Sequence, residues 1–503
     1  MKLRLTRLIW LGLCILTAVL ISAMPISAVN RSILSPILSS IDSSLASSKA
    51  LFQIALLRPK QEPLPTTVRD PAAYGSGISR TLRMLSSSTP VSANTVRILF
   101  YGQSITGQDW WLELVQRLRA QFPDAHLVVE NRAIGGFASP LLVRTAEQDL
   151  YPFYPDLVIF HVYGDEQNYE AIIANLRRRT TAEIVLASDH VTWLPSFSAA
   201  DDPEQLRVYE WFNQHTAWLE TIAQQYGCEL VDIRTAWEQH LKAQRLSPQD
   251  LLRDQVHLNA EGNHLMATLM ASHLLHPAAA QNSQIDQRVS DYPGSELNWQ
   301  QGHLSLEFTG NRVALVATPL PADLIHSSTI LIDGQPPSQF PELYALTRAS
   351  SAPGVGWPSL LQIRSASPLL LEDWQLTIRQ VSAKMDQFQF DLSGSQTGFD
   401  GSGDSQHPFI SNSQRILIQP QDWWLEQSYL FTQQPVPLGF QIRWRVEPLF
   451  TDLYRSPAIP TRTGASIDLL AQNLSNGQHR LEIISKSGEA IPIETIRVYH
   501  PLP

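Results

Sequence analysis

Two short motifs, far apart in the chain, contain the side chains best suited to covalent chemistry. Ser104 closes the stretch Arg97-Ile-Leu-Phe-Tyr-Gly-Gln-Ser104, and Asp254-Gln-Val-His257 lies far downstream. An alcohol is a poor nucleophile until a base takes its proton and a carboxylate orients that base. Each motif alone also fits a structural role, the serine as a helix cap and the Asp–His pair as a solvated loop. Their combination indicates a hydrolase with an activated serine.

The residues between the two motifs are expected to bring them together. They alternate between short apolar strands and amphipathic helices, which is typical of a parallel sheet covered on both faces. The expected strands are 96–101, 127–129, 157–162, 184–187 and 230–231, and the expected helices are 109–122, 141–150, 170–179, 204–225, 235–244 and 260–275. Ligands of such sheets bind beyond the carboxyl ends of the strands, where Ser104 and His257 could meet.

A glycine pair follows the second expected strand. Gly135 and Gly136 lie in Asn131-Arg-Ala-Ile-Gly-Gly136. Without a Cβ atom, such residues let the backbone approach a ligand closely and offer it an N–H group. An ordinary tight turn explains the same dipeptide, so the pair gains meaning only beside the other two motifs.

Together the three segments resemble the SGNH (GDSL-like) hydrolase superfamily, in order and in spacing, over residues 95–276. The resemblance implies an α/β domain with a flavodoxin-like parallel sheet, the SGNH hydrolase fold. It also implies that Ser104 is the nucleophile, His257 the base and Asp254 its orienter. The backbone N–H groups of Ser104 and Gly136 would then stabilise the oxyanion.

Two positions depart from the pattern of that superfamily. Gln103 stands where the first block usually has an acidic residue, and Glu166 stands where the third block has an asparagine. We therefore expect Asn168 to supply the third oxyanion donor from a longer loop. Losing such a donor typically costs on the order of 3 kcal/mol of transition-state stabilisation, so the departure bears on rate more than on reaction type. Gln103 and His190 are candidate substrate contacts, and a packed loop histidine is the alternative for His190.

The N-terminal segment has the features of a targeting signal. Basic residues precede a largely apolar run that ends near Met24, so residues 1–30 are expected to be a signal peptide or an uncleaved membrane anchor. Either alternative exports the rest of the chain, which would be periplasmic, secreted or anchored facing outward. Residues 31–94 are rich in serine and proline and are expected to form a stalk. At its end, residues 74–85 are expected to add a peripheral strand.

After the expected catalytic domain, residues 95–277, the pattern changes to short strands separated by Gly-Asn and Asp-Gly turns. Residues 281–503 are therefore expected to form a β-rich, sandwich-like accessory region of one or two domains that folds apart from the catalytic unit. Three tryptophans of this region could stack on sugar rings, although aromatic residues in β-sandwiches are more often core: Trp357, Trp423 and Trp424.

Composition excludes several other classes of protein. The net charge of −10 is spread without long runs, so a nucleic-acid partner is not expected. Cys14 and Cys228 are the only cysteines, and Cys14 lies in the apolar N-terminal run, which excludes an internal disulfide in the exported body and a cysteine-based zinc site. The acidic stretch 400–404 lacks the ligand spacing of an EF-hand and is expected to be a solvated turn. No cofactor or metal is expected.

The sequence therefore predicts an exported serine esterase that removes acyl groups, O-acetyl above all, from a carbohydrate. The substrate class rests on the resemblance. One alternative is a polysaccharide O-acyltransferase, which would use the same site with a sugar hydroxyl in place of water. The other is a non-catalytic glycan-binding or scaffold protein that keeps the fold and has lost efficient chemistry, which the altered third block allows.

Overall fold

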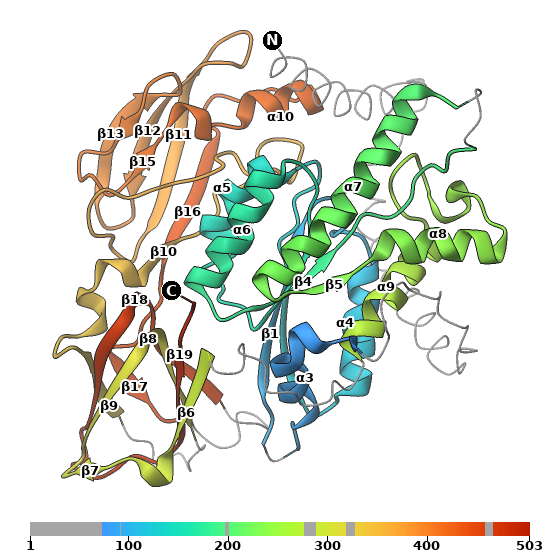
Figure 1. Ribbon diagram of the computed structural model, residues 1–503. Helices are drawn as coiled ribbons and strands as arrows, with labels where there is room; N and C mark the ends of the chain where they lie inside the picture. Colours follow the sequence, from blue (N-terminus) through green and yellow to red (C-terminus); the bar gives the residue numbers. More distant parts are fainter. Residues whose placement is uncertain are drawn as a thin grey trace, which may run out of the picture. The chain divides into compact units, whose positions relative to one another are not determined.

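The computed structural model describes residues 73–90, 92–196, 201–275, 288–317, 327–457 and 466–502 (Figure 1). The expected targeting segment, residues 1–30, and the expected stalk up to residue 72 lie outside these ranges. Within the described ranges, no helix has the length and hydropathy that a membrane span needs. From Thr67 to Pro503 the chain forms one compact unit.

The part of the chain that carries the two motifs folds around a parallel sheet. Its strands are β1 (Thr95–Gly102), β2 (His126–Asn131), β3 (Leu157–His161), β4 (Glu183–Ala187) and β5 (Glu229–Val231), in the spatial order β2-β1-β3-β4-β5. All neighbouring strands are parallel. This is the order of flavodoxin-like doubly wound sheets, so the predicted fold is confirmed. The carboxyl ends of the strands therefore meet at one edge.

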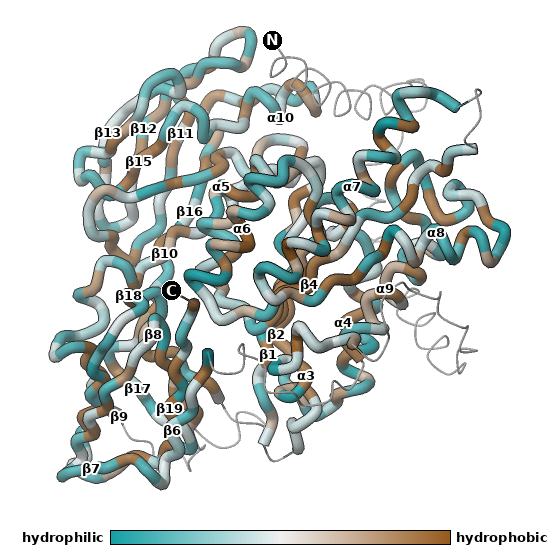
Figure 2. The backbone as a smooth tube through the Cα atoms, in the orientation of Figure 1, coloured by the Kyte–Doolittle hydropathy of each residue, from teal (hydrophilic) through white to brown (hydrophobic). Residues whose placement is uncertain are grey.

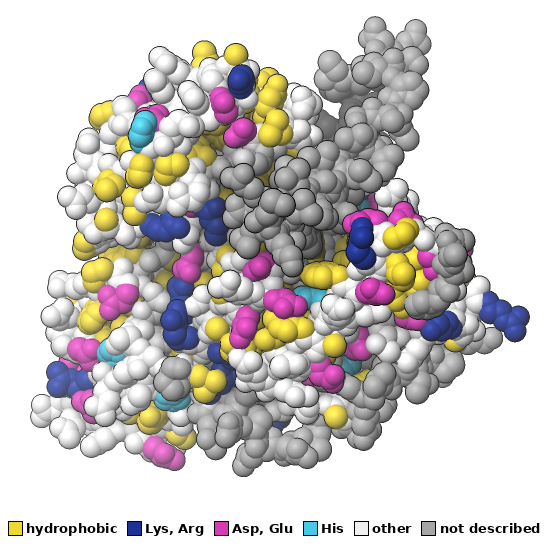
Figure 3. Space-filling view, turned by 45° about the horizontal axis from the view of Figure 1, so that its top comes forward, with side chains coloured by type: hydrophobic (Ala, Val, Ile, Leu, Met, Phe, Trp, Pro, Cys, Tyr) yellow, Lys and Arg dark blue, Asp and Glu magenta, His cyan; other side chains and the backbone are white. Residues whose placement is uncertain are grey.

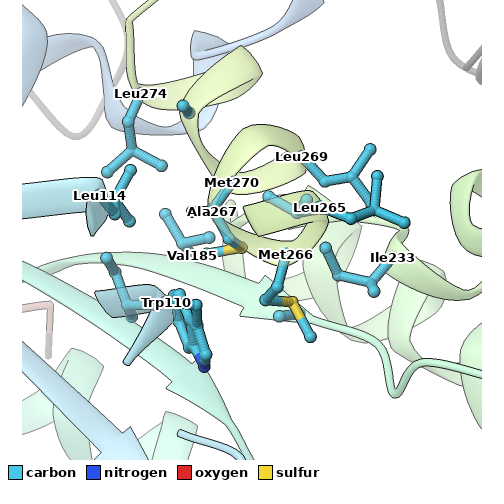
Figure 4. Packing of buried hydrophobic residues seen from close by; sticks show 14 of the residues in the cluster. Trp110, Leu114, Val185, Ile233, Leu265, Met266, Ala267, Leu269, Met270 and Leu274 are labelled. Atoms are coloured by element: carbon cyan, nitrogen blue, oxygen red, sulfur yellow. The ribbon is translucent and has the colours of Figure 1, made fainter. Parts of the chain in front are cut away.

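Helices cover both faces of this sheet because its strands alternate apolar side chains between two cores. Along β1, Val96, Ile98 and Phe100 enter one core, whereas Leu99 and Tyr101 enter the other. The first core packs against α4 (Trp110–Gln121), α8 (Ile233–Gln244) and α9 (Ala260–Leu274), seen closely in Figure 4. The second packs against α5 (Ser139–Asp149), α6 (Glu166–Arg179) and α7 (Pro203–Tyr226). Apolar residues, brown in Figure 2, gather between these layers.

A short helix precedes the first strand. The prediction of a peripheral strand over residues 74–85, at the end of a stalk, is wrong, because the stretch forms a 3-10 turn (Ser76–Ile78) and helix α3 (Ser79–Ser86). Ile78, Leu82 and Leu85 lie in the same core as the apolar residues of β1. Their spacing of four and three residues is that of one helical face. The serines around them hid this pattern, and the compact catalytic part begins before the predicted residue 95.

Buried polar groups hold α3 against the sheet. The Glu183 carboxylate accepts hydrogen bonds from the Arg80 and Thr81 N–H groups at 3.0 and 2.7 Å. The Arg80 guanidinium in turn donates to Asp156 at 3.2 Å. The first N–H groups of a helix have no partner within the helix, so Glu183 fixes where α3 starts.

The C-terminal region is β-rich, as predicted, and consists of two antiparallel sheets with separate hydrophobic cores. One sheet contains β6 (Val289–Pro293), β7 (Trp299–Gln300), β8 (His303–Ala317), β9 (Ser327–Ile332), β17 (Leu453–Arg455), β18 (Ser466–Ser485) and β19 (Ile493–Tyr499). The other contains β10 (Tyr344–Leu346), β11 (Asp373–Val381), β12 (Phe388–Gly394), β13 (Gly398–Asp404) and β16 (Gln441–Pro448). Beside it lie the pair β14 (Phe409–Ile410) and β15 (Leu417–Ile418) and the helix α10 (Leu425–Thr432). The second sheet is thus an insertion between β9 and β17 of the first (Figure 1).

The acidic stretch 400–404 is not the solvated turn that its glycines predict. It belongs to β13 and pairs with β12, and Asp400 is buried. The Asp400 carboxylate accepts hydrogen bonds from the Ser413 N–H and hydroxyl at 2.8 and 2.6 Å. Tertiary pairing overrides the weak strand propensity of glycine here.

The β-rich region packs against the catalytic part. The Arg348 guanidinium lies 2.6 Å from the Asp149 carboxylate at the end of α5, and the Tyr154 hydroxyl donates to Asn311 at 2.8 Å. Leu361 enters the core that α5 and α6 cover. The expected boundary lies in the undescribed stretch 276–287, and the described residues on both sides of it belong to one compact unit. Whether the β-rich region folds apart from the catalytic part stays a prediction.

Replacing Ile78 by alanine tests whether the segment before β1 belongs to the folded unit. Ile78 is fully buried, so the change leaves a cavity, and such substitutions cost about 2–5 kcal/mol of stability. Urea denaturation followed by tryptophan fluorescence measures the loss. Leu112→Ala, at an exposed leucine of α4, is the control and should cost about 0.5 kcal/mol or less. Equal stability of the two variants would mean that this segment acts as a stalk after all.

Candidate active site

The turn that carries Ser104 is fixed by its neighbours. A Cβ atom on Gly102 would lie 2.0 Å from the His161 carbonyl oxygen, so only glycine lets β1 end this close to β3. Thr106 Oγ1 donates a hydrogen bond to the same carbonyl at 3.0 Å. The Gln103 side chain is buried and accepts a hydrogen bond at 2.9 Å from the backbone N–H two residues later. Gln103, expected as a candidate substrate contact, therefore caps this turn.

The structure brings Ser104, His257 and Asp254 into one chain of contacts. Ser104 Oγ lies 3.1 Å from His257 Nε2, and His257 Nδ1 lies 2.9 Å from Asp254 Oδ2. A carboxylate only accepts hydrogen bonds, so Nδ1 carries the ring proton, and Nε2 of the neutral ring can accept the serine proton. In this arrangement a histidine can act as a general base toward a serine.

The backbone around Asp254 holds its carboxylate in place. Asp254 Oδ1 accepts hydrogen bonds from the Val256 and His257 N–H groups at 2.9 and 2.8 Å. Partial burial raises the pKa of Asp254, but these bonds and the His257 side chain together lower it below its ordinary value. The carboxylate is therefore ionised at neutral pH and can orient His257.

Two other histidines in the described structure also pair with an aspartate, so they can be compared with His257. His407 Nδ1 lies 2.9 Å from Asp404 in a second Asp-x-x-His motif, but no serine contacts its other nitrogen within the described residues. His479 lies 2.8 Å from Asp333 and 3.1 Å from Ser475 Oγ, yet its Nε2 also lies 3.0 Å from the Ser475 carbonyl oxygen. A carbonyl only accepts, so this Nε2 carries a proton and cannot take one from Ser475. Of the three pairs, only His257 presents an accepting nitrogen to a serine.

A residue that the sequence analysis did not single out joins the two motifs. Gln108 Nε2 donates to the Leu258 carbonyl at 3.0 Å, and Gln108 Oε1 accepts from the Leu258 N–H at 3.0 Å. Leu258 is the neighbour of His257, so this pair ties the histidine to the helix start behind Ser104. A single glutamine has no recognisable motif, and only its place four residues after Ser104 could have drawn attention to it.

The glycine pair after β2 lies beside Ser104. A Cβ atom on Gly135 would lie 3.6 Å from the Ser104 Cβ. The Phe137 N–H donates to the Ile134 carbonyl at 3.1 Å, which closes a β-turn with Gly136 at a φ of 79°. Neither the Ser104 N–H nor the Gly136 N–H donates a hydrogen bond to another described residue. Two such groups next to a nucleophile suit the stabilisation of an oxyanion.

The side chain predicted as the third oxyanion donor has another partner. Asn168 lies in the first turn of α6, and its Nδ2 donates to Asp165 Oδ1 at 2.9 Å. Asp165 is the residue that caps this helix. Asn168 makes no hydrogen bond to Ser104 or His257 in the described structure. Its role as an oxyanion donor stays a prediction, and it would require the amide to leave Asp165.

His190 lies behind the loop of His257. It is 5% exposed, and its Nε2 lies 2.8 Å from the Val256 carbonyl oxygen. Because that oxygen only accepts, Nε2 carries the ring proton. Burial lowers the pKa of His190 to about 4, against the opposing charge of Asp189. The neutral ring supports the backbone between Asp254 and His257, which favours the packed-histidine alternative over a substrate contact.

Comparison with known proteins gives the family. The GDSL-like lipase/acylhydrolase family matches residues 99–265, a range that includes Ser104, Asp254 and His257. This part of the chain belongs to that family. It is therefore an ester-bond hydrolase domain. Within the described residues, no group of three or more His, Cys, Asp or Glu side chains is arranged to hold a metal ion.

Solved structures that match part of the chain include two esterases. Axe2, an acetylxylan esterase from Geobacillus stearothermophilus, is 19% identical, with 37% of this chain and 96% of that chain covered at a TM-score of 0.32. The acetyl xylan esterase AlAXEase is 21% identical, with 35% of this chain and 98% of that chain covered at a TM-score of 0.30. Likeness at this level carries no argument about the substrate of this chain. No curated protein matches the sequence.

Gln108→Ala tests the link between the two motifs. Without its amide, the loop of His257 loses both bonds to the Ser104 side of the site. A misplacement of about 1 Å can cost about a hundredfold in rate, so we expect kcat on a small aryl ester to fall tenfold to a hundredfold at nearly constant KM. Gln116→Ala, at an exposed glutamine of α4, should leave kcat unchanged. A similar kcat for both variants would show that Gln108 does not position His257.

His190→Gln tests the buried neutral histidine through the pH dependence of stability. The unfolded chain protonates His190 below its ordinary pKa of 6.5, whereas the folded chain does so only near 4, so wild-type stability falls as pH drops between these values. At about 1.4 kcal/mol per pKa unit, this loss approaches about 3 kcal/mol. The glutamine keeps a donor for Val256 and does not titrate. Urea midpoints at pH 7 and pH 4 should therefore differ less in the variant, and equal differences would contradict the assignment.

Proposed function

We propose that this protein is a serine esterase that removes short acyl groups, acetyl above all, from hydroxyl groups of a carbohydrate outside the cytoplasm. The observation that carries the proposal is the chain of contacts from Ser104 through His257 to Asp254. Beside it lie two backbone N–H groups that have no hydrogen-bond partner in the described part of the chain. Membership of residues 99–265 in a family of acylhydrolases supports the reaction type. The expected targeting segment, residues 1–30, supports the location.

In the first half of the proposed reaction, Ser104 Oγ attacks the ester carbonyl carbon and its proton passes to His257 Nε2. The carbonyl oxygen gains negative charge and accepts hydrogen bonds from the Ser104 and Gly136 N–H groups. Asp254 stabilises the protonated ring through Nδ1. The bond to the alcohol oxygen then breaks, His257 returns the proton to the departing sugar hydroxyl, and the acyl group stays on Ser104.

In the second half, water takes the place of the sugar. His257 accepts a proton from the water as it attacks the acyl carbon, and the same two N–H groups stabilise the oxyanion. Breakage of the bond to Ser104 Oγ releases the carboxylic acid, and the proton on His257 returns to the serine. The cycle needs no group beyond the residues named.

The open position of the site supports a short acyl group on a bulky alcohol. The Asp254 side chain is 49% exposed, and Gly135 and Gly136 lie at the surface. Cavities of about 500 and 200 Å³ in the described structure lie elsewhere, one between α7, α8 and α9 and one between α5 and the β-rich region. A long acyl chain needs an apolar pocket, whereas an acetyl group does not.

The distribution of charge supports a neutral polymer. Acidic and basic side chains are interspersed on the face shown in Figure 3, without a large patch of one sign. A face with mixed charge does not attract a strongly charged polymer over long distances. An acetylated neutral polysaccharide carries no charge and does not need such attraction.

Labelling with a fluorophosphonate tests the nucleophile. The reagent reacts with activated serines, so peptide mass spectrometry should locate the adduct on Ser104, and Ser104→Ala should abolish both labelling and the release of acetate from an acetylated polysaccharide. Ser475→Ala is the matched control, because Ser475 also contacts a histidine that pairs with an aspartate, and it should change neither. An adduct on Ser475, or full activity of Ser104→Ala, would overturn the proposal. Free acetate as the product in the presence of an acceptor glycan distinguishes an esterase from an acyltransferase.

A further inference from the structure

The turn from Ile134 to Phe137 is held from outside the catalytic domain. Trp357, from the β-rich region, donates its indole N–H to the Gly135 carbonyl at 2.6 Å. Arg348, from the same region, donates to the Arg132 carbonyl at 3.0 Å. On the inner side, the Ile134 N–H donates to the Gly102 carbonyl of β1 at 3.0 Å. The turn is thus fixed between the parallel sheet and the β-rich region.

The indole of Trp357 is itself well supported. Its ring centroid lies 5.9 Å from that of Phe137 and 4.8 Å from that of Phe431 on α10. A Cβ atom on Gly136 would lie 3.3 Å from Trp357 Cζ2, so the indole packs directly on this glycine. The Ala352 N–H donates to the Trp357 carbonyl at 2.8 Å, which closes the loop that carries the tryptophan. The indole N–H is therefore held by packing on both rings and by the closed loop.

The bond to the Gly135 carbonyl determines where the Gly136 N–H points. These two groups belong to one planar peptide unit and point in opposite directions, so fixing one fixes the other. The φ of 79° at Gly136 is that of the third residue in a type II turn, and rotation of this central peptide would give a type I turn with the N–H reversed. Glycine allows both forms at little cost. The Trp357 bond selects the form that is present.

We infer that Trp357 is a positioning residue for the Gly136 N–H group, and that the β-rich region is therefore part of the active site. The inference rests on the proposed function, in which that N–H stabilises the oxyanion. Hydrogen bonding to the Gly135 carbonyl also polarises the peptide and strengthens the Gly136 N–H as a donor. The role expected of this tryptophan from the sequence, stacking on a sugar, is not needed for the inference.

The test compares two tryptophan-to-phenylalanine variants of the full chain on 4-nitrophenyl acetate. Trp357→Phe keeps an aromatic ring against Gly136 and loses the N–H. Removing an oxyanion donor costs about 10²–10³ in kcat, and a donor that is misdirected part of the time loses part of this. We therefore expect kcat to fall by about tenfold or more, with KM within about twofold of wild type. A phenylboronic acid, which forms a tetrahedral adduct with the nucleophile, should inhibit less tightly by a similar factor.

Trp424→Phe is the matched control. Its ring also contacts Phe137, at 5.7 Å, but its indole nitrogen has no hydrogen-bond partner among the described residues. It should keep wild-type kcat and wild-type inhibition. Equal kcat of the Trp357 and Trp424 variants, in a wild-type protein that hydrolyses the ester, would overturn the inference. Failure of the wild-type protein to hydrolyse the ester would instead overturn the proposed function.

Arg348→Lys provides a second variant if Trp357→Phe fails to fold. Lysine can still pair with Asp149, but it lacks the forked geometry with which Arg348 reaches both Asp149 and the Arg132 carbonyl. A lower kcat at constant KM supports the conclusion that contacts from the β-rich region position the turn. A wild-type kcat in a folded Arg348→Lys variant contradicts it.

Discussion

The chemistry available to this protein depends on one contact of 3.1 Å between Ser104 Oγ and His257 Nε2, two atoms whose residues are 153 positions apart. The parallel sheet brings both to the edge where its strands end, but a sheet alone does not fix loops to within a fraction of an ångström. Local bonds supply that precision. Gln108 ties Leu258 to the serine side, and His190 supports Val256 from behind. The loop between Asp254 and Leu258 is therefore held at two residues, Val256 and Leu258.

The proposed oxyanion site is organised differently, because its donors are backbone groups. A side-chain donor can be selected by residue type, whereas a backbone N–H is directed only by the conformation of its peptide. Gly136 makes the required conformation accessible, and Trp357 removes the alternative. With Glu166 in the place of the usual asparagine and Asn168 bonded to Asp165, the direction of each remaining donor matters more. The contact of Trp357 with the turn therefore bears directly on the proposed chemistry.

The parallel sheet and the contact between Asp254 and His257 could be predicted because their signals are local. Apolar runs alternate with helical patterns over short windows, and Asp254 and His257 lie within one turn of chain. The role of Ser104 as the nucleophile stays a prediction. Helix α3 could not be predicted because the apolar residues Ile78, Leu82 and Leu85 stand among polar residues and serines. The bonds from Glu183 that fix its start come from a residue about 100 positions away. The contacts of Gln108 and Trp357 could not be predicted, since their backbone partners lie 150 and 222 residues away in the sequence. A side chain that bonds to a backbone group can have any residue type as its partner, so the sequence holds no sign of the contact.

Comparison of the Asp–His pairs at His257, His407 and His479 shows which part of the catalytic motif is specific. Asp404 and His407 make the same local contacts as Asp254 and His257. In both motifs the aspartate accepts hydrogen bonds from the backbone N–H groups two and three residues later, and this places its carboxylate beside the histidine ring. This geometry follows from the spacing alone. His479 adds a serine contact, but the Ser475 carbonyl beside its Nε2 keeps a proton on that nitrogen. Among the described residues, His257 differs in that its Nε2 faces the Ser104 hydroxyl and no other acceptor. The Ser104 and Gly136 N–H groups beside it have no hydrogen-bond partner in that part of the chain. The motif supplies an oriented histidine, and the fold around it decides whether that histidine can act as a base.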